Sequence, residues 1–282
     1  DLTKYGYKAS AVPGTVFGLL EAHERFGRLP LEKVLRPVID QAKNGVIVSY
    51  DLHNAIGSSD QLRKDPESKR IYFKNNSPIE IGSLMKRPDL AKTFETIASE
   101  GKKGFYEGWV AQSIKASMEK NSGFIDINDL EQYSSKFRDP IGINYRGHSV
   151  YTQGPPSGGG IALLTALNIL ELYNLYKYTK DSSVTYHLLA ESLRRGHNNR
   201  SHHVGDPDYY KVPTDGLISK GRAKSLAKSI NFDKASKVSS IKKYNYIEEG
   251  KDTTHYSIID SEGNAISNTC LLYTSDAADD RV

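Results

Sequence analysis

The hydrophobic pattern of this chain changes period at residue 253, and that change constrains the fold more than any other feature. Before it, apolar residues recur at the three- and four-residue spacing of helices that face a core. From 253 to 260 the residues alternate as in a half-buried strand, and 261–264 form a hairpin turn before a return strand at 265–267. A chain that is helix-rich first and strand-rich last predicts an α+β fold.

The helical part divides into segments with recognisable ends. Two amphipathic helices near the N-terminus are expected to end at Gly27 and Gly45, and Pro37 is expected to kink the second. Asp89 is expected to cap a third helix. The other expected elements are a helix after 104–108, a short helical turn at 128–130, a strand or hairpin at 141–151, a long apolar helix from 161, and helices at 184–200 and within 214–231.

Composition excludes several classes of protein. With 38% hydrophobic residues and a mean hydropathy of −0.54, the chain has no run near the ~18 apolar residues of a membrane span. Its net charge is +4. Its densest basic stretch, 220–243, contains a single aromatic residue, Phe232. A solvated helix face therefore explains that stretch better than nucleic-acid binding. The single cysteine, Cys270, excludes an intrachain disulfide.

Both ends of the chain look altered. It starts at Asp1 without an initiator Met, which predicts a front truncation. The run from Cys270 to Val282 resembles a translated sequencing adapter, so 270–282 is interpreted as a non-native tail. The domain division that follows is 1–252, 253–269 and 270–282.

The bond between Asp252 and Thr253 is the position at which chemistry is expected. A threonine hydroxyl is a nucleophile only when a base removes its proton, and a threonine made N-terminal by cleavage carries that base in its own α-amine. Such an amine titrates near ~8, close to working pH. Thr253 is therefore a candidate nucleophile, although the local residues alone favour an ordinary edge strand.

The loop 157–160, Ser-Gly-Gly-Gly, opens the long apolar helix. Backbone N–H groups at a helix start bind anions, but glycines that permit close backbone approach explain the loop better. Arg200 is expected to be held by Asp206, which follows in a Gly-Asp-Pro turn.

His187 and Glu191 share a helix face, but the chain lacks the spacing of a zinc site. Glu191 and Arg195, four residues apart, are better explained as a surface ion pair. No metal ligand is therefore assigned.

Seven short segments occur in the order and spacing of a known family. They are 11–15 (Ala-Val-Pro-Gly-Thr), 105–108 (Phe-Tyr-Glu-Gly), 129–133 (Asp-Leu and then Tyr133), 145–147 (Tyr-Arg-Gly), 155–159 (Pro-Pro-Ser-Gly-Gly), 205–207 (Gly-Asp-Pro) and 253–265 (Thr-Thr-His-Tyr-Ser, then Asp260 and Gly-Asn-Ala). Together they resemble the γ-glutamyltranspeptidases, also called glutathione hydrolases, over residues 5–269. Gly158 stands where that family has a second serine.

The resemblance implies an N-terminal-nucleophile hydrolase with a four-layer α-β-β-α sandwich, incomplete in this chain. It implies that the precursor cuts itself before Thr253, whose hydroxyl is then the nucleophile and whose α-amine is the general base. Residues 1–252 would belong to a large subunit, and 253–269 would begin the small catalytic subunit that is its partner. The implied substrates are glutathione and other γ-glutamyl compounds, with water, amino acids or dipeptides as acceptors. No cofactor, metal or nucleic acid is implied.

The chain departs from the family pattern outside these segments. The arginine that binds the substrate α-carboxylate is expected before Asp1, and the oxyanion-hole glycines are expected after the hairpin. Leu271 and Tyr273 stand where the family has a threonine and an asparagine. Because oxyanion stabilisation is usually the largest catalytic term, we expect these 282 residues alone to be inactive and the parent gene to encode an active enzyme.

Two other functions are consistent with the sequence. One is a related amidase of the same nucleophile class, of the β-lactam side-chain acylase type. The other is a non-enzymatic relative that never matures. Bacterial members of the family are typically periplasmic or secreted, which is the location that the resemblance implies.

Overall fold

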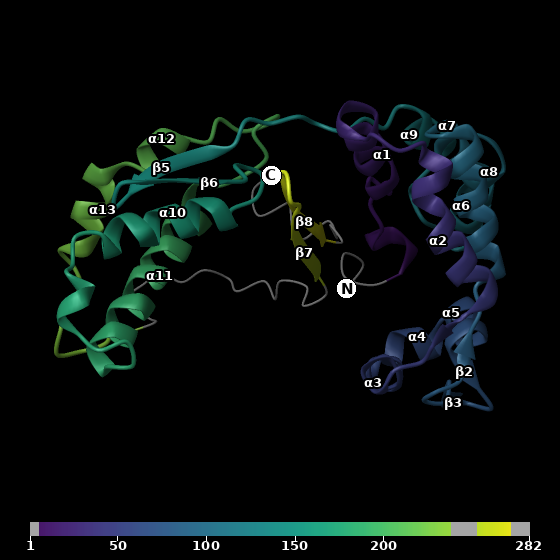
Figure 1. The fold of residues 1–282 in the computed structure, drawn as a ribbon, viewed down its shortest axis with the longest axis horizontal. Coiled ribbons are helices and arrows are strands. Elements are labelled where there is room, and N and C mark those ends of the chain that lie inside the picture. Colours follow the sequence, from purple (N-terminus) through teal and green to yellow (C-terminus); the bar gives the residue numbers. More distant parts are fainter. Residues whose placement is uncertain (1–5, 238–252, 272–282) are drawn as a thin grey trace. The chain divides into compact units, whose positions relative to one another are not determined.

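The computed structural model describes residues 6–237 and 253–271. Contacts divide the chain into two compact units between Ser135 and Lys136, here called the N-terminal unit and the C-terminal unit. All sheets among the described residues are antiparallel pairs of strands. Helices predominate first and the longest hairpin comes last, which confirms the α+β class (Figure 1).

The N-terminal unit consists of helices joined by short strand pairs (Figure 1). β1 pairs with β4 and β2 pairs with β3, each over two residues. The elements are η1 (Tyr7–Ala9), α1 (Thr15–Phe26), α2 (Leu31–Asn44), β1 (Val46–Ile47), α3 (Tyr50–Ser58), α4 (Asp60–Lys64), α5 (Pro66–Tyr72), β2 (Phe73–Lys74), β3 (Ser77–Pro78), β4 (Leu84–Met85), α6 (Pro88–Glu100), α7 (Lys103–Tyr106), α8 (Gly108–Lys120) and α9 (Ile127–Glu131).

The two helices predicted near the N-terminus are confirmed as α1 and α2. The first ends before Gly27 and the second before Gly45. Gly45 has a φ of 102°, a conformation that glycine adopts without strain, so it ends the helix for the reason that the sequence suggested. Pro37 lies inside α2.

Two features of this unit differ from the predictions. Asp89 does not cap α6: Pro88 opens the helix and Arg87 takes the cap position, because proline at the first position needs no hydrogen-bond partner. Asp89 lies in the first turn, where the helix dipole favours a negative charge. The stretch after residue 50, for which no element was predicted, forms three short helices, α3 to α5, whose N-caps are the side chains of Ser49, Ser59 and Asp65.

The C-terminal unit is built around one helix, α10, that is apolar on most sides. Ile161, Leu164 and Ile169 on α10 are fully buried. They pack against α11, α13 and the β5–β6 hairpin, so this helix is the centre of the core. The elements are β5 (Ile141–Tyr145), β6 (His148–Thr152), α10 (Gly159–Leu170), η2 (Leu175–Lys177), α11 (Ser183–His203), α12 (Thr214–Leu217) and α13 (Lys220–Ala227).

The last described segment is a hairpin of two seven-residue strands, β7 (Thr253–Ile259) and β8 (Ala265–Leu271). They pair in antiparallel register from Thr253 with Leu271 to Ile259 with Ala265. The alternation predicted from residue 253 is thus confirmed as a strand. Among the described residues, no helix is long and apolar enough to cross a membrane.

Candidate active site

Thr253, the predicted nucleophile, is the first residue of β7. It pairs with Leu271 at the open end of the hairpin. Because strand positions alternate between faces, position 253 shares a face with His255 and Ser257. Asp252, on the other side of the predicted scissile bond, lies outside the described residues.

The face that includes position 253 carries an imidazole among three hydroxyl groups. His255 Nδ1 lies 2.8 Å from Thr269 Oγ1. Its Nε2 lies 3.2 Å from Ser257 Oγ and 3.4 Å from Ser267 Oγ. These contacts join the two strands two residues from the predicted nucleophile. The alternation of the strand places His255 on this face but does not show which groups its ring contacts.

The turn of the hairpin is closed by one carboxylate. Asp260 Oδ1 accepts hydrogen bonds from the main-chain N–H groups of Glu262 (3.0 Å) and Asn264 (2.9 Å), and Oδ2 accepts one from the Asn264 side chain (2.9 Å). The side-chain bond from Asn264, together with these main-chain bonds, lowers the pKa of Asp260. Gly263 has a φ of 84°, which glycine tolerates. The predicted hairpin turn is confirmed.

The opposite face of the hairpin carries exposed apolar side chains. Tyr256, Ile258 and Ile266 expose 42, 56 and 48% of their surface. An isolated two-stranded hairpin is at best marginally stable in water. Ladder and turn hydrogen bonds, rather than buried apolar area, therefore hold this segment together among the described residues.

The glycine loop before α10 is closely packed. A Cβ at Gly160 would lie 2.1 Å from the Gln153 carbonyl oxygen, and one at Gly158 would lie 2.5 Å from the Arg200 side chain. This packing supports close backbone approach over anion binding as the reason for the glycines. Where the family pattern has serine, the space at residue 158 is taken by Arg200.

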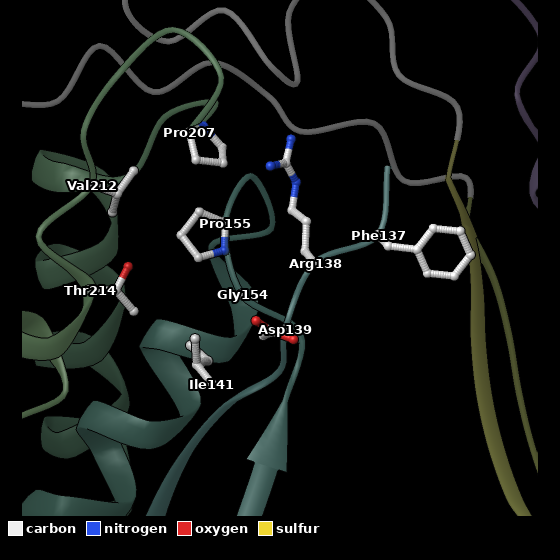
Figure 2. Close-up of a pocket in the computed structure, with 9 residues that line it drawn as sticks. All are labelled: Phe137, Arg138, Asp139, Ile141, Gly154, Pro155, Pro207, Val212 and Thr214. Atoms are coloured by element: carbon white, nitrogen blue, oxygen red, sulfur yellow. The ribbon is translucent and has the colours of Figure 1, made fainter. Parts of the chain in front are cut away.

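A pocket opens beside this loop, between the segments that flank β5–β6 and the chain before α12 (Figure 2). Its cation, Arg138, lies 3.1 Å from Asp208 Oδ1 and 3.5 Å from Asp206 Oδ1. The Arg138 hydrogen bond lowers the pKa of Asp208. Asp206 thus pairs with Arg138, and the pocket's cation is already balanced by carboxylates. The contact predicted between Arg200 and Asp206 stays a prediction. The lining residues are Phe137, Arg138, Asp139, Ile141, Gly154, Pro155, Pro207, Val212 and Thr214.

His187 has a structural contact. Its Nε2 lies 2.8 Å from the Asn231 carbonyl oxygen, which joins α11 to the chain after α13. Within the described ranges, no group of three or more His, Cys, Asp and Glu side chains is arranged to hold a metal ion.

The ion pair between Glu191 and Arg195 is buried, so its prediction as a surface pair is wrong. The two side chains expose 1% and 10% of their area, and Glu191 Oε2 lies 2.5 Å from Arg195 Nη1. Burial alone would raise the pKa of Glu191, but hydrogen bonds from Ser236 and Arg195 outweigh it and lower the pKa to about 2. The four-residue spacing correctly predicted that Glu191 and Arg195 pair. It could not predict their burial, because the chain after α13 packs against them.

Three of the family-like segments meet inside the N-terminal unit. The Tyr106 hydroxyl donates to the Pro13 carbonyl oxygen (2.6 Å) and accepts from the Phe17 N–H (3.0 Å). The Tyr133 ring stacks on Tyr106, and a Cβ at Gly14 would lie 2.0 Å from the Tyr133 hydroxyl oxygen. Burial raises the pKa of Tyr106 to about 12. We call these five residues the aromatic cluster; their contacts fix the start of α1 against α7.

A fourth family-like segment caps α10. Arg146, in the turn between β5 and β6, donates through Nη2 to the carbonyl oxygens of Tyr173 (3.0 Å) and Leu170 (3.4 Å). Its main-chain N–H donates to Glu171 Oε1 (2.7 Å). A cation at a helix C-terminus binds the last carbonyl groups and complements the helix dipole.

Most family-like segments outside the hairpin thus have residues that are required for packing. Sequence comparison assigns these segments to one family. The sequence profile described as Gamma-glutamyltranspeptidase matches residues 1–275. The chain belongs to the γ-glutamyltranspeptidase family. Membership explains why scattered turns, caps and glycines recur together with the Thr253 hairpin.

Individual relatives agree with this assignment. The chain is 38% identical to a glutathione hydrolase proenzyme of Escherichia coli K12, over 95% of this chain and 47% of the relative. It is 35% identical to the Acylase ACY 1 proenzyme of Pseudomonas sp. strain SE83, over 94% of this chain and 47% of the relative. It thus spans about half the length of these curated relatives.

The fold also agrees. The structure of Helicobacter pylori γ-glutamyltranspeptidase matches with a TM-score of 0.83 at 35% identity, over 89% of this chain and 73% of that chain. The likeness confirms the predicted N-terminal-nucleophile hydrolase fold for this member of the family.

Proposed function

We propose that the whole protein is a self-cleaving hydrolase and transferase of γ-glutamyl compounds, with Thr253 as its nucleophile. The observation that carries the proposal is that Thr253 opens a strand in a chain similar to enzymes named as glutathione hydrolase proenzymes. A proenzyme requires a processing step, and an N-terminal threonine requires a cleaved bond before it.

Self-cleavage would proceed by an acyl shift. The Thr253 hydroxyl oxygen attacks the Asp252 carbonyl carbon, the peptide C–N bond breaks, and the nitrogen takes a proton to become the free α-amine of Thr253. Water then hydrolyses the resulting ester, which returns the hydroxyl and leaves a carboxylic acid on Asp252. The product carries nucleophile and base on one residue.

Turnover would use the same hydroxyl. The α-amine takes its proton as the oxygen attacks the γ-glutamyl amide carbon of glutathione, and cysteinylglycine leaves with a proton on its nitrogen. The γ-glutamyl ester is then transferred to water, an amino acid or a dipeptide. The partner in this proposal is the protein's own small subunit, which begins at Thr253.

The test is mass spectrometry and a γ-glutamyl anilide assay on the complete gene product. Wild-type protein should separate into two chains cut before Thr253, and Thr253→Ala should remain a single inactive chain. Turnover that survives Thr253→Ala would refute the assignment of the nucleophile. A wild-type product that remains one chain and never turns over would favour the non-maturing relative.

An acylase is the second candidate function, and the similarity to Acylase ACY 1 favours it specifically. Both candidates use the same nucleophile, so the substrate must separate them. The complete gene product should hydrolyse a γ-glutamyl anilide at least ~10-fold better, in kcat/KM, than a glutaryl amide, which lacks the α-amino group. The reverse order would establish the acylase.

We also propose a periplasmic or secreted location for the mature protein. Fractionation of expressing bacteria, with activity measured in periplasm, medium and cytoplasm, tests it. Activity confined to the cytoplasm would contradict this location without affecting the chemistry.

A further inference from the structure

One imidazole joins the two strands of the hairpin close to residue 253. His255 Nδ1 on β7 lies 2.8 Å from Thr269 Oγ1 on β8, and its Nε2 lies 3.4 Å from Ser267 Oγ on the same strand. His255 and Thr269 also pair in the strand register, two positions from the pair of Thr253 with Leu271. A side-chain contact therefore supplements the main-chain ladder next to the predicted nucleophile.

The two ends of the hairpin are restrained in different ways. At the turn, Asp260 accepts hydrogen bonds from the main-chain N–H groups of Glu262 and Asn264. Residue 253 begins β7 at the other end, far from the turn. In a protein cut before Thr253 this residue would also be a chain terminus, and termini are poorly ordered unless they are tied down. A contact between the strands therefore matters most at the open end.

The contact is polar and directional. The face positions 255, 257, 267 and 269 hold the imidazole and three hydroxyl groups, and all four residues are exposed. Hydrogen bonds at these positions fix the spacing of the strands within narrow limits of distance and angle. One exposed cross-strand pair contributes little to global stability, whereas a misplacement of ~1 Å at a reacting group can lower a rate by about 10²-fold. This pair is therefore better suited to positioning than to stabilising the fold.

We propose that His255 is a positioning residue for Thr253, and that it acts through the contact of its Nδ1 with Thr269. The inference rests on the proposed function. In this role His255 holds β7 against β8 at the end where residue 253 begins the strand. The nucleophile is then presented to the γ-glutamyl amide in one geometry, which is what a fast attack requires.

The test measures kcat and KM for a γ-glutamyl anilide with the complete gene product, per molecule cut before Thr253 as counted by mass spectrometry. His255→Phe keeps a ring but removes both nitrogens. It should lower kcat about 10-fold and change KM less than about 2-fold, because it disturbs the attacking group rather than substrate binding.

Two conservative variants separate the two ring nitrogens. His255→Asn places an amide atom near the position of Nδ1, whereas His255→Gln places one near the position of Nε2. The asparagine can still reach Thr269 and should keep kcat within about 3-fold of wild type, whereas the glutamine should resemble His255→Phe. The reverse order would overturn the assignment of the role to the Thr269 contact.

The partner residue offers a matched pair of variants. Thr269→Val keeps the branched shape but loses the hydroxyl, and should lower kcat as far as His255→Phe does. Thr269→Ser keeps the hydroxyl and should stay within about 2-fold of wild type. The double variant His255→Phe with Thr269→Val should be no slower than either single variant, because both remove the same contact.

Asn168→Ala is the control for lost stability. Asn168 is buried on α10 and donates to the Ile218 carbonyl oxygen (2.7 Å), away from the hairpin contacts. Asn168→Ala should lower the melting temperature more than His255→Phe does, yet change kcat less than about 2-fold.

The outcomes are distinct. A wild-type product without turnover that depends on Thr253 defeats the proposed function. Wild-type turnover that depends on Thr253, with His255→Phe as fast as wild type or slowed only as much as Asn168→Ala, defeats the positioning role alone. If His255→Phe does not fold or is not cut, Thr269→Val and Thr269→Ser decide, and equal kcat values for the two overturn the positioning role.

Discussion

The aromatic cluster of the N-terminal unit and the β7–β8 hairpin carry equally family-like segments, yet they are built in opposite ways. Tyr106 is 4% exposed and its hydroxyl has two main-chain partners. In the hairpin, Tyr256 is 42% exposed, and the contacts of His255 within the described part of the chain are with hydroxyls of its own two strands. Family-like segments therefore include both a buried cluster and an exposed hairpin, and the burial of their polar groups distinguishes the two.

The largest effect should come from the hairpin. In the complete gene product, Thr253→Ala should abolish self-cleavage and lower turnover at least ~10³-fold, because nucleophile and base are lost together. The melting temperature should fall little, since a threonine-to-alanine change in a strand costs at most about 1 kcal/mol. If Thr253→Ala instead lost much stability and kept partial activity, position 253 would serve structure rather than chemistry.

In the aromatic cluster, Gly14→Ala should destabilise without touching the chemistry. Its new Cβ would lie 2.0 Å from the Tyr133 hydroxyl oxygen, and overpacking of this kind costs about 1–3 kcal/mol. Gly18→Ala is the matched control, because it lies inside α1 with no atom within 4 Å of its Cβ, and should gain about 0.4–1 kcal/mol. Denaturant unfolding measures both, and equal effects would show that Gly14 is not confined by Tyr133.

Tyr106→Phe should cost about 1–3 kcal/mol, because the Phe17 N–H and the Pro13 carbonyl lose their partner in a buried site. Tyr209→Phe, at a residue that is 90% exposed, should change stability by less than about 0.5 kcal/mol. Thermal unfolding in the Thr253→Ala background compares them. Similar values would mean that the Tyr106 hydroxyl contributes nothing.

Alkaline pH should act through the same hydroxyl. The pKa of Tyr106 is raised from 10.0 to about 12, so its contribution to stability is complete below pH 10. As pH rises from 10 toward 12 the unfolded chain loses this proton more readily than the folded chain, and stability falls. Unfolding free energies across that range should fall less steeply in Tyr106→Phe than in wild type, and parallel curves would contradict the assignment.

The smallest effect on global stability should come from the hairpin turn. Asp260→Ala removes the acceptor for Glu262 and Asn264, so amide exchange should quicken within β7 and β8 while the rest of the chain is unchanged. Asp260→Asn, which keeps one acceptor oxygen, should show a weaker effect. Faster exchange throughout the C-terminal unit would show that the turn is coupled to its core.

Sequence pattern predicted most elements because each is encoded locally. The glycines after α1 and α2, the apolar run of α10 and the alternation of β7 act within a few residues of one another. The prediction at Asp89 was wrong because Pro88 competes for the same helix start. The short helices α3 to α5 escaped notice because their caps are ordinary serine and aspartate residues in a polar stretch.

The candidate site was predictable only in part. Thr253 is proposed as the nucleophile through the resemblance of its segment to a family, since an ordinary strand has the same local pattern. The surface assignment of Glu191 failed because spacing along a helix shows which side chains are neighbours, not what covers them. The contact of His255 with Thr269 could not be predicted, because it depends on the register that pairs these two residues across the strands.

Sequence alone determined the α+β order, the family and the strand that begins at Thr253, because periodicity, turn residues and motif order are properties of neighbouring residues. Tertiary structure decided which polar groups are buried: Tyr106 beneath Tyr133, Arg146 over the end of α10, and Glu191 on Ser236. The physical reason is that a hydrogen bond in a buried site depends on atoms brought together from distant parts of the chain, and desolvation makes those bonds indispensable.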